Sequence, residues 1–277
     1  MTFRSPGDVQ LNADVPWAAF DPIAYVEHNY RGLQAEDAEI LQIVGDHFGD
    51  HFRGRDTAGV SGIDVGAGAN LYPALAMLPW CDEITLYERS PSNVRYLESQ
   101  VASYDGNWDQ FWDLLRKNEA YGALELDPRA RFRDVVRVQS GNLFDLVRHE
   151  GRWSMGTMFF VAESMTTSHD EFRRAVECFL RALAPGAPFA AAFMEHSIGY
   201  YTGDHFFPAC DVGELEVYES LRPFAGEFET MRLKASAAVR EGYSGMIVAY
   251  GRRNSESNIP ESGTPGSGTP ETGIPTG

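Results

Sequence analysis

A short apolar run leads into a glycine-rich turn and then into a helical stretch, and this junction constrains the fold more than any other part of the chain. Gly59–Val65 reads as a buried strand, residues 66–70 (Gly-Ala-Gly-Ala-Asn) form the turn, and Leu71–Leu78 reads as a helix. Glycines let the backbone approach a ligand where a side chain would collide, and a helix start offers free N–H groups. By itself the pattern is equally compatible with a simple tight turn.

The rest of the chain alternates apolar runs with stretches of helical periodicity. Ser90-Pro91 and the capping box Ser168–Glu171 predict helix starts. Helical crossovers between the first five strands predict a seven-stranded, mainly parallel, Rossmann-like α/β sheet with helices on both faces. After the first strand, the predicted strands are Glu83–Tyr87, Asp134–Gln139, Thr157–Ala162, Pro188–Met194, Phe228–Leu233 and Met246–Tyr250.

Two additions flank this pattern. Leu33–Phe52 is helical and precedes the first strand, and an insertion at Tyr104–Arg133 contains Trp108 and Trp112. We expect both to cover the carboxyl edge of the sheet. The chain ends in a segment of Ser, Gly, Thr, Pro and Glu that has too little apolar surface to fold. The expected organisation is one domain over residues 1–253, with a helical lid (1–58) and an α/β core (59–253), followed by a disordered tail (254–277).

Composition narrows the classes of partner. The net charge of −17 opposes binding to nucleic acid or anionic lipid, and suits a cationic or neutral small molecule. No apolar run approaches the roughly 20 residues that span a bilayer. The three cysteines form no CxxC pair, and His47 and His51, flanked by acids, fit a solvated helix face better than a metal site. We therefore expect a soluble cytoplasmic protein with no membrane, nucleic-acid or metal partner.

An acidic residue and a missing glycine indicate the cofactor. Glu88 ends the second strand, 22 residues after Gly66, where a carboxylate can accept hydrogen bonds from ribose hydroxyls. Leu71 occupies the place of the third glycine in the dinucleotide fingerprint, which disfavours the alternative of an NAD-dependent oxidoreductase. An adenosine ligand without pyrophosphate, such as S-adenosylmethionine, needs no such glycine. Asn142 follows the third strand and offers a donor and an acceptor to adenine.

Further motifs occur in order over residues 17–253, and on them the chain resembles a methyltransferase family. That family contains nicotinamide, phenylethanolamine and indolethylamine N-methyltransferases and the thioether S-methyltransferase. The matching motifs are Phe20-Asp21-Pro22-x-x-Tyr25-x-Glu27-x-x-Tyr30, Ile63–Gly68 followed by Tyr72, Glu83-Ile84 leading through Glu88 to Ser92-Asn93, Trp108, Leu183–Gly186, and Tyr200-Tyr201.

The resemblance implies a class I methyltransferase fold whose N-terminal helices close over S-adenosylmethionine. It implies that Tyr25 and Tyr30 contact the methionine end of the cofactor, and that Glu195 faces an acceptor amine. Tyr25 and Glu195 are accordingly the predicted catalytic residues. The predicted cofactor residues are Tyr25, Tyr30, Asp64, Gly66, Gly68, Tyr72, Glu88, Asn93, Asn142 and Leu143, and the predicted substrate residues are Glu163, Glu195, Tyr200 and Tyr201.

The sequence departs from the family pattern at Asn29, Glu88, Asn142 and the acceptor segment Gly203–Asp211. The predicted function is methyl transfer from S-adenosylmethionine to a small molecule, with an amine nitrogen as the favoured acceptor. Two alternatives remain: an enzyme of cyclase or lyase type that uses the same cofactor without transferring methyl, and a non-catalytic module that binds it.

Overall fold

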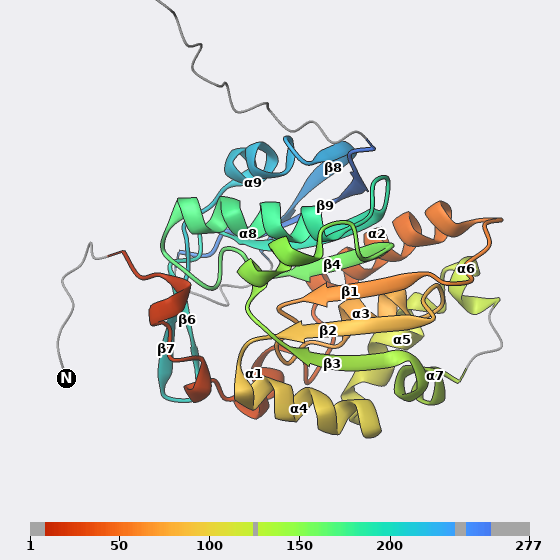
Figure 1. Ribbon diagram of the computed structural model, residues 1–277. Coiled ribbons are helices and arrows are strands. Elements are labelled where there is room, and N and C mark those ends of the chain that lie inside the picture. The colour runs from red at the N-terminus through yellow and green to blue at the C-terminus, as the bar shows by residue number, and fades with distance from the viewer. Residues whose placement is uncertain (1–8, 124–126, 236–241, 256–277) are drawn as a thin grey trace, which may run out of the picture.

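Seven strands form one sheet in the order β3-β2-β1-β4-β5-β9-β8 (Figure 1). The computed structural model describes residues 9–123, 127–235 and 242–255. The first five of these strands are parallel, β9 runs antiparallel to β5, and β8 runs antiparallel to β9. This arrangement confirms the predicted fold. The strands are β1 (Ser61–Val65), β2 (Glu83–Glu88), β3 (Val136–Ser140), β4 (Met155–Phe159), β5 (Pro188–Glu195), β8 (Ala225–Lys234) and β9 (Gly245–Arg253).

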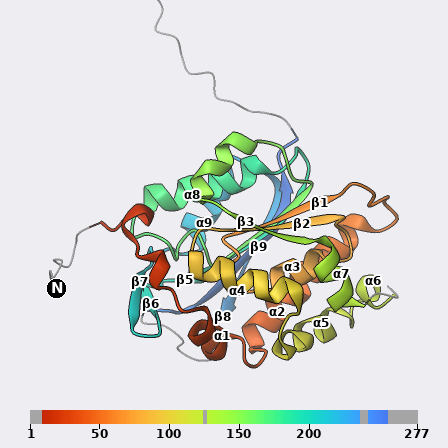
Figure 2. The same cartoon turned by 60° about the horizontal axis from the view of Figure 1, so that its bottom comes forward.

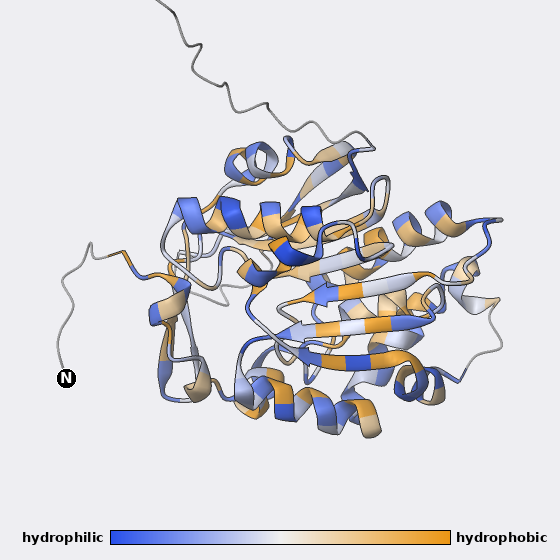
Figure 3. Cartoon of the chain, in the orientation of Figure 1, coloured by the Kyte–Doolittle hydropathy of each residue, from blue (hydrophilic) through white to orange (hydrophobic). Residues whose placement is uncertain are grey.

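Helices cover both faces of the sheet (Figure 2). One face carries α2 (Ala35–Phe52), α3 (Tyr72–Met77) and α4 (Pro91–Ala102), and the other carries η4 (Leu143–His149), α8 (His169–Ala182) and α9 (Glu214–Leu221). Both predicted helix starts are confirmed, because Ser90 caps α4 and Ser168 caps α8. Hydrophilic and hydrophobic stretches alternate along α8 in Figure 3, as expected of a helix with one face on a sheet.

The insertion between β2 and β3 lies mostly away from the carboxyl edge. It folds into η3 (Gly106–Trp108), α5 (Asp109–Leu115), α6 (Glu119–Gly122) and α7 (Pro128–Val135). Helix α5 packs against α2 and α3, and α7 runs directly into the start of β3 at the amino edge. The expected cover of the carboxyl edge is therefore wrong for most of the insertion, and also for α2, which lies on a face of the sheet against β5 and β9. The apolar side chains of the insertion are buried against helices, and Trp108 reaches the back of Tyr30, with 5.4 Å between the ring centroids.

The carboxyl edge is covered instead by the N-terminal segment and by a hairpin that the sequence did not predict. Figure 1 shows both at the end toward which the parallel strands point. The segment contains η1 (Asn12–Asp14), η2 (Trp17–Ala19) and α1 (Pro22–Asn29), and the hairpin pairs β6 (Gly199–Thr202) with β7 (His205–Pro208). Helix α1 contacts both β6 and α4.

The remaining expectations concern metals, membranes and the tail. Within the described residues, no group of three or more His, Cys, Asp or Glu side chains is placed to hold a metal, and no helix is long and apolar enough to cross a membrane. His47 is not on a solvated face: its Nε2 lies 3.1 Å from the carbonyl oxygen of Gly251, and burial lowers its pKa to about 4. Residues 256–277, most of the predicted tail, lie outside the described residues.

Candidate active site

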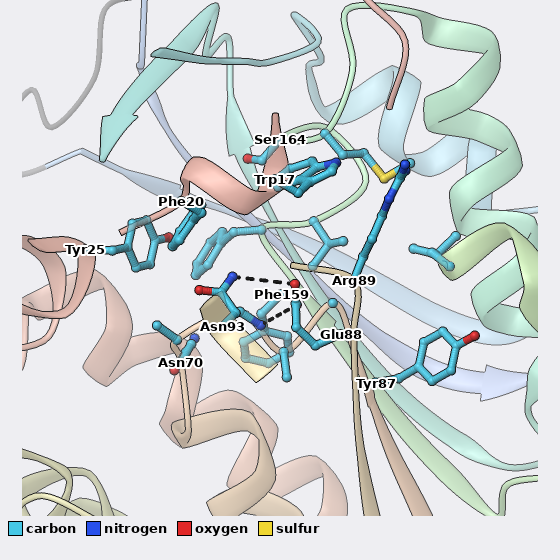
Figure 4. A pocket seen from close by; sticks show the side chains of 18 of the residues that line it. Trp17, Phe20, Tyr25, Asn70, Tyr87, Glu88, Arg89, Asn93, Phe159 and Ser164 are labelled. Carbon is cyan, nitrogen blue, oxygen red and sulfur yellow. Dashed lines mark hydrogen bonds between the residues drawn. The ribbon is translucent and has the colours of Figure 1, made fainter. Parts of the chain in front are cut away.

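A cavity lies at the carboxyl edge, between the parallel strands and the N-terminal segment (Figure 4). Eight of the residues predicted for the site line it: Tyr25, Tyr30, Gly66, Gly68, Glu88, Asn93, Leu143 and Tyr200. Six others do not: Asp64, Tyr72, Asn142, Glu163, Glu195 and Tyr201.

The turn after β1 needs its glycines. Gly66 and Gly68 have φ values of +65° and +59°, a backbone region that favours glycine. A Cβ atom on Gly66 would also lie 2.5 Å from Cγ1 of Val161, closer than real Cβ contacts allow. The turn therefore brings bare backbone to the cavity wall.

Glu88 at the end of β2 is held by the same turn. The N–H of Gly68 donates to its Oε2 at 2.9 Å, and the N–H of Ser90 donates to its Oε1 at 2.6 Å. Burial raises the pKa of Glu88, and these donors act against that rise. The carboxylate is thus fixed in the cavity wall, with lone pairs remaining for ligand hydroxyls.

Asn93, on α4, lies beside Glu88. Its hydrogen bonds indicate whether this part of the cavity suits an adenosine ligand. Its Nδ2 is 3.5 Å from Oε1 of Glu88, whereas its buried Oδ1 has no hydrogen-bond partner among the described residues. A buried acceptor without a partner is expected to be satisfied by a ligand or by water. A carboxylate and an amide oxygen side by side suit the two ribose hydroxyls of S-adenosylmethionine.

Asn142 lies at the end of β3 but does not line the cavity. Its Oδ1 accepts from the N–H of Phe144 at 3.2 Å, because Asn142 is the N-cap of η4, and from Nδ2 of Asn12 at 3.4 Å. The neighbouring Gly141 and Leu143 do line the cavity. The residues on either side of Asn142 therefore line the cavity in its place, while the Asn142 side chain holds Asn12 of the N-terminal segment.

Asp64 and Tyr72 lie outside the lining of the cavity. Oδ1 of Asp64 accepts from the Thr157 hydroxyl at 2.8 Å, and burial raises the Asp64 pKa to about 8. The Tyr72 hydroxyl donates to Oδ1 of Asp37 at 3.0 Å, and its ring lies 5.9 Å from that of Tyr30, centroid to centroid. Neither side chain reaches the position that the resemblance implied.

The lid tyrosines do reach the cavity. Tyr25 on α1 and Tyr30 at its C-terminal cap have ring centroids 5.8 Å apart. Tyr25 also lies 6.4 Å from the ring of Tyr200, whose hydroxyl donates to the carbonyl oxygen of Ser164 at 3.2 Å. These rings connect α1 to the β6–β7 hairpin at the cavity wall.

Three predicted substrate residues have other surroundings. Tyr201 is 68% exposed and packs on Phe206, because neighbouring residues of a strand point to opposite faces. Glu163 is buried, and its Oε1 accepts from the N–H of Met194 at 3.2 Å and from the Ser164 hydroxyl at 2.9 Å. Glu195 is paired with Arg232, whose Nε lies 2.5 Å from its Oε1, and also accepts from the Ser244 hydroxyl. The bond from Arg232 lowers the Glu195 pKa.

Several lining residues escaped the sequence analysis. Arg89 follows Glu88 and donates through Nη1 to the carbonyl oxygen of Asn12 at 3.1 Å, so it holds the segment that covers the cavity. Phe160, just after β4, has φ of +60°, a strained conformation that often marks functional sites. Phe20 is the first residue of the Phe20-Asp21-Pro22-x-x-Tyr25 motif, and its place in that motif could have identified it as a site residue. The other overlooked residues are Asn12, Trp17, Ala67, Ala69, Asn70, Tyr87, Phe159, Val161, Ser164 and Met165; Gly141, next to Asn142, was expected near the adenine and does line the cavity.

Solved structures share this fold at low sequence identity. The N-methyltransferase NodS from Bradyrhizobium japonicum WM9, in complex with S-adenosyl-L-homocysteine, aligns over 86% of this chain and 95% of its own, with 13% identity and a TM-score of 0.51. A S-adenosylmethionine-dependent methyltransferase from Methanosarcina mazei aligns over 71% and 93%, with 14% identity and a TM-score of 0.49. The 1,6-didemethyltoxoflavin-N1-methyltransferase from Burkholderia thailandensis aligns over 79% and 80%, with 15% identity and a TM-score of 0.48. These likenesses concern the fold alone.

The sequence comparisons are more specific. A search of curated protein sequences finds no match. The model of the NNMT/PNMT/TEMT family, in contrast, matches residues 9–252, which include the lid, the glycine turn, Glu88 and the hairpin. With nearly all of the described chain matched, this protein belongs to the NNMT/PNMT/TEMT family of methyltransferases, and its cofactor is S-adenosylmethionine.

Proposed function

We propose that this enzyme transfers the methyl group of S-adenosylmethionine to an amine nitrogen of a small molecule. The observation that carries the proposal is one continuous cavity with two unlike parts. Glu88, Asn93 and Gly141 line the first part from the end of β2, the start of α4 and the residue after β3, whereas Tyr25 and Tyr200 line the second part from α1 and β6. A cofactor held at the first part would point its reactive end toward the second.

The aromatic part suits a small amine or a nitrogen-containing ring. Trp17 and Phe20 from the N-terminal segment join Tyr25 and Tyr200 there, and the rings of Phe20 and Tyr25 lie 5.2 Å apart, centroid to centroid. Aromatic faces attract cations and stack on flat rings, and the strong negative charge of the protein favours cationic or neutral substrates. We assign acceptor binding to Tyr25 and Tyr200.

Methyl transfer from a sulfonium is an in-line displacement, so most of the catalysis is positioning. Among the described residues, Glu88 is the one carboxylate that lines the cavity, and it lies at the ribose end. In our proposal the amine therefore enters uncharged and needs no base at the moment of transfer. Glu163 does not contact the ligand in this proposal; it holds the cavity wall in place by accepting hydrogen bonds from Ser164 and Met194. Glu195 likewise acts indirectly, through its ion pair with Arg232.

The test is to incubate the enzyme with methyl-labelled cofactor and a panel of amines, pyridines and thiols, and to follow both halves of the cofactor by mass spectrometry. We expect labelled methyl on a nitrogen and one S-adenosylhomocysteine for each methyl transferred. Tyr200→Ala should raise the KM for that acceptor by about tenfold or more, while Tyr201→Ala, its exposed neighbour, should leave it unchanged.

Other products would contradict the proposal. Methylthioadenosine without a methylated acceptor would indicate the cyclase or lyase type of reaction. Binding of S-adenosylmethionine without any turnover across the panel would favour the non-catalytic module.

A further inference from the structure

The chain leaves β5 through a turn before it enters the β6–β7 hairpin (Figure 1), and the residue at this turn is strained. His196, the first residue after β5, has φ of +57°, in the left-handed backbone region that is uncommon for residues other than glycine. Among the described residues, only Phe160 shares this feature. Such a conformation persists where the surrounding structure holds it. The neighbours of His196 therefore determine how the chain enters the hairpin.

Two hydrogen bonds join His196 to the segment that follows the hairpin. Its Nδ1 lies 2.7 Å from Oδ1 of Asp211, and its N–H donates to the carbonyl oxygen of Val212 at 3.0 Å. On the other side, a Cβ atom on Gly242 would lie 2.5 Å from the carbonyl oxygen of His196, so the glycine allows a close approach. His196 precedes β6, and Asp211 follows β7. The pair of His196 and Asp211, here called the hairpin clasp, thus joins the two ends of the hairpin.

The hairpin carries Tyr200, which lines the cavity and stacks on Phe207 of the neighbouring strand, with 5.6 Å between the ring centroids. A two-stranded hairpin is at most marginally stable alone, so its position depends on its attachments. Toward the cavity, the Tyr200 hydroxyl donates to the carbonyl oxygen of Ser164 at 3.2 Å, and the N–H of Cys210 donates to that of Glu163 at 2.7 Å. The hairpin clasp is a further attachment, outside the cavity.

The hairpin clasp lies at the surface, since the side chains of His196 and Asp211 are 51% and 63% exposed. An exposed pair contributes little to the free energy of unfolding, so its loss should leave the fold intact. A weak contact can still govern positioning, because a displacement of about 1 Å is enough to impair a site that works by alignment.

We propose that His196 and Asp211 position Tyr200 for acceptor binding by fixing the base of the β6–β7 hairpin. Neither is among the described residues that line the cavity, so both are positioning residues. The proposal rests on the proposed function in one respect, which is the assignment of Tyr200 to the acceptor.

Two substitutions break the hairpin clasp, and a third keeps it. His196→Gly removes the ring but suits the left-handed backbone, and Asp211→Ala removes the acceptor of the bond. His196→Asn keeps a donor, because Nδ2 of asparagine lies where histidine has Nδ1, and asparagine tolerates this backbone region. Glu219→Ala is the matched control, since it breaks another exposed pair, with Arg222 at 3.0 Å at the end of α9.

With an acceptor that the enzyme methylates, both clasp-breaking variants should raise the acceptor KM by about threefold to fivefold, as for loss of one exposed pair. The kcat and the affinity for S-adenosylhomocysteine should stay within about twofold of the wild type. His196→Asn and Glu219→Ala should behave as the wild type does. A purely structural role would lower the thermal stability of the variants and leave the acceptor KM unchanged wherever they are folded.

Hydrogen exchange across residues 199–208 is a readout that needs no acceptor. Without ligand, it should be about threefold to fivefold faster in both clasp-breaking variants and unchanged in the other two. Absence of any methylated acceptor would count against the proposed function alone, because the exchange still tests the clasp. Thermal unfolding checks each variant, and if one clasp-breaking variant does not fold, the other decides. Unchanged hairpin exchange overturns the proposal, as does faster exchange with an unchanged acceptor KM, or an asparagine variant that behaves as the glycine variant does.

Discussion

The hydroxyl of Tyr72 donates to Oδ1 of Asp37 at 3.0 Å, and this bond joins the helix after the glycine turn to the long N-terminal helix α2. Both side chains are buried, and burial raises the Asp37 pKa to about 7. The bond gives Tyr72 a structural role in this protein, because it holds the hydroxyl away from the cavity.

Tyr72→Phe should therefore destabilise the protein rather than weaken cofactor binding. The substitution leaves a buried carboxyl without its donor, which costs about 1–3 kcal/mol of unfolding free energy. The loss should be larger at pH 8, where Asp37 is ionised, than at pH 5. Urea denaturation at both pH values and calorimetry with S-adenosylhomocysteine would measure this, and the affinity should stay within about twofold. A tenfold weaker affinity with unchanged stability would place the hydroxyl in the site.

Glu88→Gln should separate ligand binding from support of the glycine turn. The amide oxygen can still accept one backbone N–H, so the fold should persist, but the charge that strengthens bonds to ribose hydroxyls is gone. The affinity for S-adenosylhomocysteine should fall by about tenfold or more, since such bonds contribute roughly 1.5–3 kcal/mol. Glu83→Gln, at the exposed start of the same strand, is the matched control and should bind normally. Equal affinities for the two variants would remove Glu88 from the site.

Local backbone rules explain what the sequence predicted well. The glycine turn, the acid at the end of β2 and the serine caps each follow from residues a few positions apart, and all are present in the structure. The mainly parallel sheet follows from the regular alternation of strands and helices. These features depend little on the rest of the chain.

The failures have a common physical cause, which is a competing hydrogen-bond partner, in most cases one distant in the sequence. Tyr72 bonds to Asp37, and Glu195 bonds to Arg232. The Asn142 side chain caps η4 by accepting from the N–H of Phe144, and it also accepts from the amide of Asn12. Each of these side chains has the right type and lies near the expected place, but a hydrogen bond formed in the folded protein turns it away from the cavity. A motif specifies a residue type and does not reveal such competing partners.

The pH dependence of stability should reveal the role of Glu195. Its pKa is lowered, mainly by the bond from Arg232. A carboxyl whose pKa is lower in the folded state stabilises that state above its unfolded value near 4.3, and the contribution is lost as the pH falls through the folded pKa. Glu195→Gln should thus be less stable than the wild type at pH 7, with the difference shrinking toward pH 3.

The same variant tests the acceptor role that the resemblance implied. If Glu195 acts through Arg232, acceptor KM and kcat at a temperature where both proteins are folded should change by less than about threefold. A large fall in turnover with unchanged unfolding and unchanged affinity for S-adenosylhomocysteine would instead show that Glu195 faces the acceptor.

The N-terminal segment should become more ordered when the cofactor binds. Two serines of the α4 start hold it: the Ser90 hydroxyl donates to the carbonyl oxygen of Trp17 and the Ser92 hydroxyl to that of Phe20, each at 2.7 Å. Tyr25 and Tyr30 line the cavity from this segment, so a bound ligand adds contacts that exist only when the segment is closed. Ligand at a hundred times its Kd favours the closed state by about 2.7 kcal/mol.

Hydrogen exchange across residues 17–33 should therefore slow by up to about a hundredfold with saturating S-adenosylhomocysteine. Local exchange in α9, which packs against α8 and β8 away from the cavity, provides the internal control. Ser92→Ala removes one attachment and should speed exchange in α1 without ligand, while saturating ligand should restore most of the protection. Exchange that is equally fast with and without ligand would mean that α1 is a fixed wall of the cavity, and that the cofactor enters by another path.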